Sequence, residues 1–406
     1  MAWDSILAKD FCKSVRDGTH DTPKQMEMGY KLVTSKCIHD GFIFPEEAYF
    51  ISEKDYRAIN ERSLVEQWDV LMSMIGNGLG RSAVVKQKPD YAIKNLALFK
   101  VGDEYKAKWL HYYLSSPVGQ GLIYNSLQGS GQPFISLNLL RNFAIPNPPY
   151  EAIKKIVSVL ELYDNLIENN QKQIKLLEEA AQRLYKQWFI DLRYPGHETT
   201  PIVDGLPKGW RKEKFGDIVD YIRGTSYTSS ELSDSDGVLM VNLKNINAFG
   251  GYKRNAEKRF TGKYKENGIL EQGDLVMGCT DMTKERRLVG HVALIPNLRE
   301  PTIFTMDLLK LLPKRISKTF LYAQCRFGGL SYKISPLANG ANVLHLRPEN
   351  MADIEVLCPA KSIVEMYDNV FASMISKIEK LEDEIQLAAE SRNRLLPKLM
   401  NGELEV

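Results

Sequence analysis

The sequence predicts an α+β chain in which two pseudo-repeated domains are separated by two long antiparallel coiled-coil helices. Short matching segments recur in the same order at a nearly constant offset, which indicates an internal duplication. Each copy ends in a long heptad stripe. With 406 residues, 44% of them hydrophobic, the chain is also long enough to bury two cores of ordinary size.

The duplication rests on three matched segments and one fainter match. Each pair is weak by itself, but a chance origin would not preserve both the order and the offset. Residues 66–72 (EQWDVLM) reappear as 271–277 (EQGDLVM), 80–85 as 290–295, 130–135 as 339–344, and, more faintly, 16–19 as 223–225.

Both heptad stripes alternate steps of three and four residues, as the seam of a coiled coil does. Because the stripes are in phase, we expect the two helices to pack on each other in antiparallel directions. Pro149 and Pro359 stand at the predicted helix starts, where the missing amide hydrogen costs nothing. The first seam is Ile153, Ile156, Leu160, Tyr163, Ile167, Asn170, Ile174, Leu177, Ala181, Leu184 and Trp188; the second is Val364, Tyr367, Phe371, Met374, Ile378, Leu381, Ile385, Ala388, Arg392, Leu395 and Leu399.

Two polar residues interrupt these seams. Asn170 lies in the middle of the first and is expected to fix the helix register or to face a partner helix. Arg392 lies near the end of the second, where solvated fraying is the expected state. The predicted boundaries are 1–148 for the first domain, 149–195 for the first helical spacer, 196–358 for the second domain and 359–406 for the second spacer.

Composition excludes several classes of protein. The formal net charge of +2 permits a nucleic-acid partner but does not indicate one, so any basic surface must be local. The N-terminus lacks a signal peptide, and no run of eighteen apolar residues occurs, which favours the cytoplasm and no membrane partner. Five dispersed cysteines and six histidines favour neither a disulfide framework nor a metal site.

The tetrapeptide Asn147-Pro148-Pro149-Tyr150 raises an alternative function. An Asn-Pro-Pro-Tyr motif is typical of enzymes that methylate the amino group of adenine and grip the flipped base. The glycine-rich turn Gly76-x-Gly78-x-Gly80 follows an apolar run and could serve a cofactor. However, the second copy keeps only a proline, in Leu357-Cys358-Pro359-Ala360, and the βα alternation of a nucleotide-binding sheet is missing. The tetrapeptide is therefore interpreted as a turn and helix start.

Over essentially its full length the chain resembles the specificity (S) subunit of type I restriction-modification enzymes. The motifs that carry the resemblance are Leu206-Pro207-Lys208-Gly209-Trp210, Arg223-Gly224-Thr225, the two Glu-Gln-x-Asp strands, the glycine turn and the closing segment 396–404 (LPKLMNGEL). The resemblance implies two target recognition domains, each reading one half of a bipartite, asymmetric DNA site. The first copy lacks the Leu-Pro-x-Gly-Trp start, which leaves its boundary and recognition surface less defined.

The resemblance also implies that the chain performs no chemistry and binds no cofactor itself. The implied partners are double-stranded DNA, two modification subunits that use S-adenosylmethionine, and restriction subunits that use ATP and Mg²⁺ for translocation and cleavage.

Loops between the strands are expected to supply the DNA contacts, with Lys and Arg on phosphates and polar side chains on bases. No catalytic and no metal-binding residues are predicted. The candidates in the second copy are Arg223, Thr225, Tyr227, Asn242, Lys244, Asn245, Lys253, Arg254, Lys284, Arg286, Arg287 and Asn342; those in the first are Arg16, Thr19, Lys36, Arg81, Gln128, Ser130 and Gln132.

Three hypotheses therefore stand after the sequence: a DNA-reading scaffold without catalysis, an adenine-N6 DNA methyltransferase built on Asn147–Tyr150, and a coiled-coil adaptor that binds only protein. The duplicated domains and matched helices favour the first.

Overall fold

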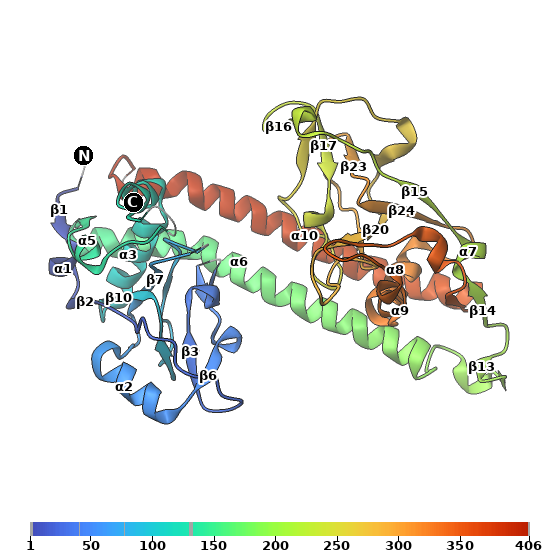
Figure 1. Cartoon of the computed structure of the whole chain (residues 1–406), viewed down its shortest axis with the longest axis horizontal. Coiled ribbons are helices and arrows are strands. Elements are labelled where there is room, and N and C mark those ends of the chain that lie inside the picture. Colours follow the sequence, from blue (N-terminus) through green and yellow to red (C-terminus); the bar gives the residue numbers. More distant parts are fainter. Residues whose placement is uncertain (1–2, 40, 77, 130–132, 405–406) are drawn as a thin grey trace. The chain divides into compact units, whose positions relative to one another are not determined.

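The computed structural model describes residues 3–39, 41–76, 78–129 and 133–404, and the chain forms two compact units. Unit 1 comprises Met1–Asn169 and Glu384–Val406, and unit 2 comprises Asn170–Asp383. Two long helices, α6 (Tyr150–Tyr185) and α10 (Lys361–Met400), contribute residues to both units. The first is coloured green and the second red in Figure 1.

Unit 1 contains the first domain. Its strands are β1 (Ser5–Leu7), β2 (Ser14–Asp17), β3 (Tyr30–Val33), β4 (Ile38–His39), β5 (Phe42–Ile43), β6 (Tyr49–Ile51), β7 (Val70–Ser73), β8 (Ser82–Val84), β9 (Tyr91–Ile93), β10 (Leu96–Lys100) and β11 (Ala144–Pro146). Its short helices are α1 (Ala8–Phe11), α2 (Glu53–Ser63), α3 (Glu104–Ser115), α4 (Pro117–Asn125) and α5 (Leu137–Arg141).

Unit 2 contains the second domain. Its main strands are β14 (Arg211–Lys214), β15 (Val219–Arg223), β16 (Leu232–Ser233), β17 (Val238–Val241), β18 (Lys258–Phe260), β19 (Ile269–Leu270), β20 (Leu275–Gly278), β21 (Thr280–Asp281), β22 (Val292–Leu294), β23 (Thr302–Phe304), β24 (Leu308–Pro313), β25 (Leu344–His345) and β26 (Glu355–Cys358). A hairpin of β12 (Ile202–Val203) and β13 (Leu206–Pro207) precedes them, and the helices are α7 (Phe215–Ile218), α8 (Lys318–Phe327) and α9 (Leu330–Ile334).

The strand order confirms the internal duplication. Each unit has a four-stranded antiparallel sheet, in the order β2-β10-β7-β8 in the first copy and β15-β24-β20-β22 in the second. A second sheet follows in each, built around one parallel pair, β3 with β9 and β17 with β23. Matching antiparallel pairs, β1 with β11 and β14 with β26, complete the repeat. The α+β class with two pseudo-repeated domains is therefore confirmed.

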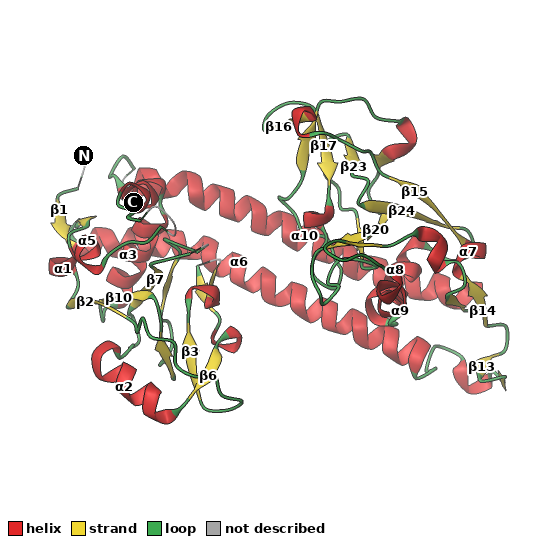
Figure 2. Ribbon diagram, viewed as in Figure 1, coloured by secondary structure: helices red, strands yellow, loops and turns green. Residues whose placement is uncertain are grey.

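The copies differ on the outer face of the second sheet. In unit 1, helix α2 covers this face and buries Leu32, Ile51 and Ala92 with its own Ile59 (Figure 2). In unit 2, no helix follows β18; the chain runs through a short 3₁₀ turn, Glu266–Gly268, into the added strand β19.

The Glu-Gln-x-Asp motif forms a buried ion pair in both copies. Asp69 and Asp274 each accept a hydrogen bond from the backbone amide three residues earlier, at 2.7 Å and 2.9 Å. Lys100 Nζ lies 2.9 Å from Asp69, and Lys310 Nζ lies 2.5 Å from Asp274. Strand register makes Leu98 the counterpart of Lys310, so the two lysines come from positions two residues apart on the same strand face.

The same register corrects the sequence alignment of Arg16 with Arg223. Leu309 pairs with Arg223, and the position in the first copy that corresponds to Leu309 is Ala97, since these residues face Met277 and Met72. Ala97 pairs with Asp17, so the counterpart of Arg223 is Asp17 and not Arg16. Arg16 and Arg223 thus lie on opposite faces of their sheets, because a shift of one residue reverses the face of a strand.

The tetrapeptide is also displaced by one residue. The Pro149 carbonyl accepts hydrogen bonds from the backbone amides of Ala152 and Ile153. The Ala360 carbonyl accepts in the same way from Ile363 and Val364. Its counterpart is therefore Cys358-Pro359-Ala360-Lys361, one residue later than the sequence comparison predicts.

Within each unit the two long helices pack side by side in antiparallel directions. In unit 1, Ile153 and Leu160 of α6 share a core with Leu396 and Leu399 of α10. In unit 2, Tyr185 near the end of α6 packs against Tyr367 near the start of α10, with ring centroids 6.3 Å apart. All predicted seam residues are buried or half-buried, which confirms the heptad pattern.

Arg392 corrects the expectation of a solvated, frayed end. Its Nη1 lies 2.5 Å from Asp164 Oδ1 of α6, and the Tyr112 hydroxyl donates to the other oxygen of the same carboxylate at 2.5 Å. The arginine side chain is only 28% exposed. Asn170 is buried at 2% exposure, as expected of a seam position.

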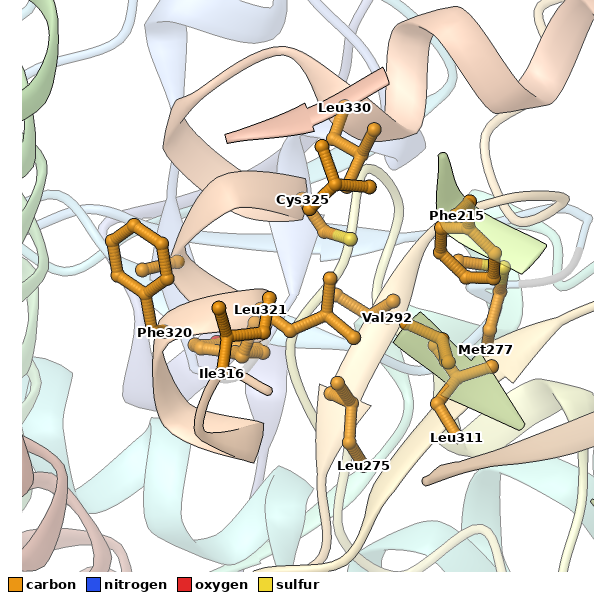
Figure 3. Packing of buried hydrophobic residues seen from close by; sticks show 14 of the residues in the cluster. Phe215, Leu275, Met277, Val292, Leu311, Ile316, Phe320, Leu321, Cys325 and Leu330 are labelled. Carbon is orange, nitrogen blue, oxygen red and sulfur yellow. The ribbon is translucent and has the colours of Figure 1, made fainter. Parts of the chain in front are cut away.

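The largest core of unit 2 joins the four-stranded sheet to helix α8 and to both long helices. Figure 3 shows Leu321 and Cys325 of α8 beside Val292 of β22, with Leu275, Met277 and Leu311 on the neighbouring strands. Trp210 of the predicted domain start is buried. Its ring centroid lies 5.7 Å from that of Phe189 and 4.9 Å from that of Tyr194. In unit 1, Trp3 stands in the same place before β1 and packs on the core there, so the first copy keeps the tryptophan although it lacks the motif.

Among the described residues, no helix combines the length and the apolar content that crossing a membrane requires.

Candidate nucleic-acid interface

A capped 3₁₀ turn presents one exposed lysine at the same place in each copy. In unit 1, Thr34 caps Ser35–Cys37 and accepts from the Lys36 amide at 3.4 Å. In unit 2, Asn242 caps Leu243–Asn245 and accepts from the Lys244 amide at 3.0 Å. The residue that closes each turn, Cys37 or Asn245, is buried, whereas the lysine is exposed. The local fold therefore fixes the backbone beneath a free ammonium group in both copies.

In unit 1 this turn forms one wall of a cavity of about 820 Å³. A second wall is the glycine turn after β7, where Gly76 and Gly80 adopt φ values of 84° and 82° that favour glycine. The two walls are close, since a Cβ on Gly78 would be in van der Waals contact with the Ser35 carbonyl oxygen at 3.4 Å. The cavity is lined by Ser35, Lys36, Ile75, Gly76, Gly78, Leu79, Arg81, Asn95, Tyr124, Leu127 and Pro133.

A third loop reaches the same edge in both copies. Gln128 and Phe134 exchange backbone hydrogen bonds of 2.9 Å and 3.0 Å, as Asn339 and His345 do at 3.0 Å and 2.9 Å. The first of these loops is tied to the glycine turn by a bridge between Ile75 and Phe134. In unit 2 the pairing of β21 with β25 makes the corresponding connection. Loops distant in sequence therefore converge, and the structure brings Lys36 and Arg81 together in one cavity.

The second copy carries a longer, more basic loop between β21 and β22. Lys284 and Arg287 are exposed there, and Arg286 is half-buried with a φ of 52°. Arg223 and Thr225 lie at the end of β15; the arginine is exposed, while the threonine bridges to Thr305.

Three predicted contacts have structural roles in unit 2. Asn242 and Asn245 are 5% and 0% exposed, and their amides bond to Ala256 O at 2.6 Å and to Lys253 O at 2.9 Å. Arg254 pairs with Glu382 at 3.0 Å and Asp383 at 2.9 Å, both on α10. In this structure both amides and this guanidinium bond within the protein, and their selection as DNA contacts stays a prediction.

Tyr227 is engaged as well, because its hydroxyl accepts from Lys258 Nζ at 2.7 Å and its ring lies under the same ammonium group. Thr19 is half-buried and forms a backbone bridge with Lys94. Ser130 and Gln132 lie outside the described residues. Four further predicted contacts are exposed side chains: Arg16, Gln128, Lys253 and Asn342. For all candidates in both copies, contact with DNA stays a prediction.

The cavity also contains residues that the sequence did not single out. Tyr124 of α4 is 59% exposed beside the cavity, where its ring is available for stacking. Asn95 has a φ of 56° and accepts from His20 Nδ1 at 2.9 Å. A positive φ favours asparagine and gives a weak signal for Asn95, but no sequence pattern reveals that one tyrosine of a helix is exposed.

The tetrapeptide forms a strand end and helix entry. The Asn147 amide donates to Asp4 O at 2.8 Å, and the Tyr150 hydroxyl donates to Asp103 Oδ2 at 3.0 Å. The Tyr150 ring meets Tyr105 edge-on at 6.5 Å. The Asn147 backbone bond extends the pairing of β1 with β11, and the Tyr150 side-chain contacts lie at the start of α6.

The arrangement holds no evident centre for metal chemistry. Within the described parts of the chain, no group of three or more His, Cys, Asp or Glu side chains is placed to hold a metal ion. The five cysteines are buried and unpaired, and burial raises the pKa of Cys279 to about 11 and of Cys325 to about 12.

Comparison with known proteins identifies the family that the first copy matches. A family model for the type I restriction modification DNA specificity domain matches residues 5–179, which include the first copy and most of α6. The MjaVIII specificity subunit of Methanocaldococcus jannaschii, a type I restriction enzyme subunit, is 21% identical over 417 residues, covering 100% of this chain and 93% of its own length. Residues 5–179 therefore match the type I specificity domain, and the chain as a whole is similar to a type I specificity subunit.

Other specificity subunits agree with this assignment. The MjaIX subunit of the same organism is 26% identical over 323 residues, covering 74% of this chain and 69% of its own length. The crystal structure of the type I S subunit from M. genitalium aligns with a TM-score of 0.58 at 13% identity, covering 98% of this chain and 96% of that one. That similarity shows a shared fold.

Proposed function

We propose that this specificity subunit reads a bipartite, asymmetric DNA site. Each copy of the domain recognises one half of the site, a short base sequence that is called a word below. The observation that carries the proposal is the repeated capped turn, which places Lys36 and Lys244 at matched positions beside converging loops. An exposed lysine on a fixed backbone suits a phosphate contact that sets the register of a reader on DNA. The residues around the two lysines differ, so two copies of one fold can read different words.

The proposal assigns no catalysis to the chain. Modification subunits that use S-adenosylmethionine would dock on it and transfer the methyl group, and restriction subunits that use ATP and Mg²⁺ would join them. The Asn147–Tyr150 junction supports this division, because the Tyr150 hydroxyl is bonded to Asp103 and the counterpart of Tyr150 in the other copy is Lys361.

Selection from random duplexes tests the proposal. The full chain, assembled with its modification subunit, is mixed with random duplexes and the retained DNA is sequenced. We expect enrichment of two short words separated by a spacer of fixed length. Retained DNA without any enriched word would contradict the reading function, and failure to retain DNA would favour a protein-only adaptor.

Binding of labelled S-adenosylmethionine to the isolated chain separates reading from methyl transfer. We expect no stoichiometric binding at concentrations that saturate the assembled complex. Tight binding of one cofactor per chain would instead support the methyltransferase built on Asn147–Tyr150.

A further inference from the structure

A single buried carboxylate holds both ends of the basic loop in the second copy. Asp281 is 0% exposed and stands where β21 leads into the loop. Its Oδ1 accepts from the Thr283 amide at 2.7 Å and from the Thr283 hydroxyl at 2.8 Å. Its Oδ2 accepts from the amides of Leu288 at 2.6 Å and Val289 at 3.2 Å. Both oxygens are therefore used, one for each end of the loop.

The bonds fix the segment that carries three basic residues. Thr283 extends the clamp, because its hydroxyl accepts from the Arg287 amide at 3.3 Å and its carbonyl from the Arg286 amide at 3.2 Å. A bridge between Gly278 and Val289 closes the base. The backbone is pinned on both sides of Lys284, while the side chains of Lys284 and Arg287 remain exposed.

The carboxylate has no ion-pair partner among its hydrogen-bond donors. Its donors are three backbone amides and one hydroxyl, and these hold the pKa of Asp281 below its ordinary value despite burial. A buried charge satisfied in this way has one favoured geometry, since moving the loop would leave the charge unbonded.

We propose that Asp281 is a positioning residue that orders the Lys284–Arg287 segment for reading the DNA word of the second copy. The inference rests on the proposed function. An ordered loop binds more tightly and more selectively than a mobile one, because the entropy of ordering is lost before DNA arrives. Asp281 itself need not touch DNA.

The first copy provides an internal comparison. Its equivalent segment is short and turns on glycine, with Gly76 at the position that corresponds to Asp281. No carboxylate clamp can form at a glycine. Removing the clamp should therefore affect only the word that the second copy reads. A general loss of stability would affect both words.

The substitution Asp281→Asn, in the full chain assembled with its modification subunit, tests the proposal. Asparagine keeps the shape but replaces one acceptor oxygen with a donor, so it can accept either from Thr283 or from Leu288 and Val289, and one end of the loop loses its bonds. In selection from random duplexes we expect the second-copy word to lose sequence preference and the first-copy word to keep it. Affinity for a duplex carrying the wild-type site is expected to fall about tenfold, as loss of a buried acceptor predicts.

Asp368→Asn serves as the matched control, because Asp368 is a half-buried carboxylate of the same unit that accepts from Ser317. It should leave both words intact. Both words retained by Asp281→Asn, with affinity within about twofold, would overturn the proposal; so would equal loss from both words. Absence of any word with the wild-type chain would instead refute the proposed function.

A milder variant covers the case in which Asp281→Asn unfolds the domain. Thr283→Ala removes the hydroxyl bond to Asp281 and the acceptor for the Arg287 amide, and leaves the three backbone bonds. In selection from random duplexes, we expect Thr283→Ala to weaken the sequence preference of the second-copy word only, and by less than Asp281→Asn does. Unchanged selection by a folded Thr283→Ala chain, together with an unfolded Asp281→Asn chain, would contradict a positioning role.

Discussion

At the scale of single residues, Lys36 and Lys244 give matched predictions. Replacing either with alanine removes one exposed ammonium group from a capped turn without disturbing the cap. We expect weaker binding to all duplexes and a slope of log affinity against log salt that is smaller by about one. Titration of the assembled complex with labelled duplex at several salt concentrations measures both. Lys361→Ala, which removes a lysine that is 90% exposed on α10, controls for net charge; an equal change in that variant would contradict the assignment.

Tyr150 tests the methyltransferase alternative. Tyr150→Ala removes the hydroxyl bond to Asp103 and the edge contact with Tyr105, so we expect a small loss of stability. Methyl transfer by the assembled complex should remain within about twofold of wild type, because the residue serves a helix entry. Radiolabelled methyl incorporation into duplex measures it, and lost transfer with DNA binding preserved would revive the catalytic interpretation.

Residue types alone predicted the site only in part. Lys36 and Arg81 were predicted and do line one cavity. Asn242 and Asn245 have the chemistry of base contacts, but the same amides also satisfy buried backbone groups, and here they do. Arg16 shows a different limit, since an alignment error of one residue in a strand reverses the face on which a side chain lies.

At the scale of elements, the repeated Asp–Lys pairs differ in their pH response. Asp274 contacts two ammonium groups, those of Lys310 and Lys318, and its pKa is lowered. Burial dominates at Asp69, which contacts Lys100, and its pKa is raised. A lowered folded pKa stabilises the fold above the ordinary Asp pKa of 3.8 and loses that contribution as pH falls; a raised pKa has the opposite effect.

We therefore expect Asp274→Asn to reduce the pH dependence of the free energy of unfolding in the acid range more than Asp69→Asn does. Near neutral pH, Asp274→Asn should cost about 3–5 kcal/mol, because two lysines lose their partner. Urea unfolding of each variant between acid and neutral pH measures both effects. Equal flattening by the two variants would contradict the difference between the copies.

The helix seam in unit 1 gives a prediction about Arg392. Its pair with Asp164 is mostly shielded from water, and the carboxylate also accepts from Tyr112. A double-mutant cycle with Arg392→Ala and Asp164→Asn should show a coupling of about 1–3 kcal/mol in thermal unfolding. Additive single effects would indicate the solvated arginine that the sequence suggested.

Heptad periodicity predicted both long helices well, because burial of a seam depends on the spacing of apolar residues along one helix. Helix α6 begins at Tyr150 and α10 at Lys361, close to the predicted prolines. The ion pair of Arg392 was not predictable, since its partner lies far away in the sequence and on the other helix.

At the scale of the whole molecule, the internal duplication predicted the fold and the wider function followed from it. Two copies with one strand order explain why segments such as 66–72 and 271–277 match while the loops between strands diverge. Loop lengths and clamps, such as Asp281 opposite Gly76, arise from local hydrogen bonds that no repeat reveals. The words that the copies read depend on this divergent part.

The most direct test of two separate readers changes one copy at a time. Arg81→Ala alters the first copy and Arg287→Ala the second, and each removes an exposed guanidinium from a converging loop. Random-duplex selection with each assembled variant should relax one word and leave the other unchanged, with the spacer length preserved. If either substitution relaxed both words equally, or if both substitutions relaxed the same word, the account of two independent readers would be wrong.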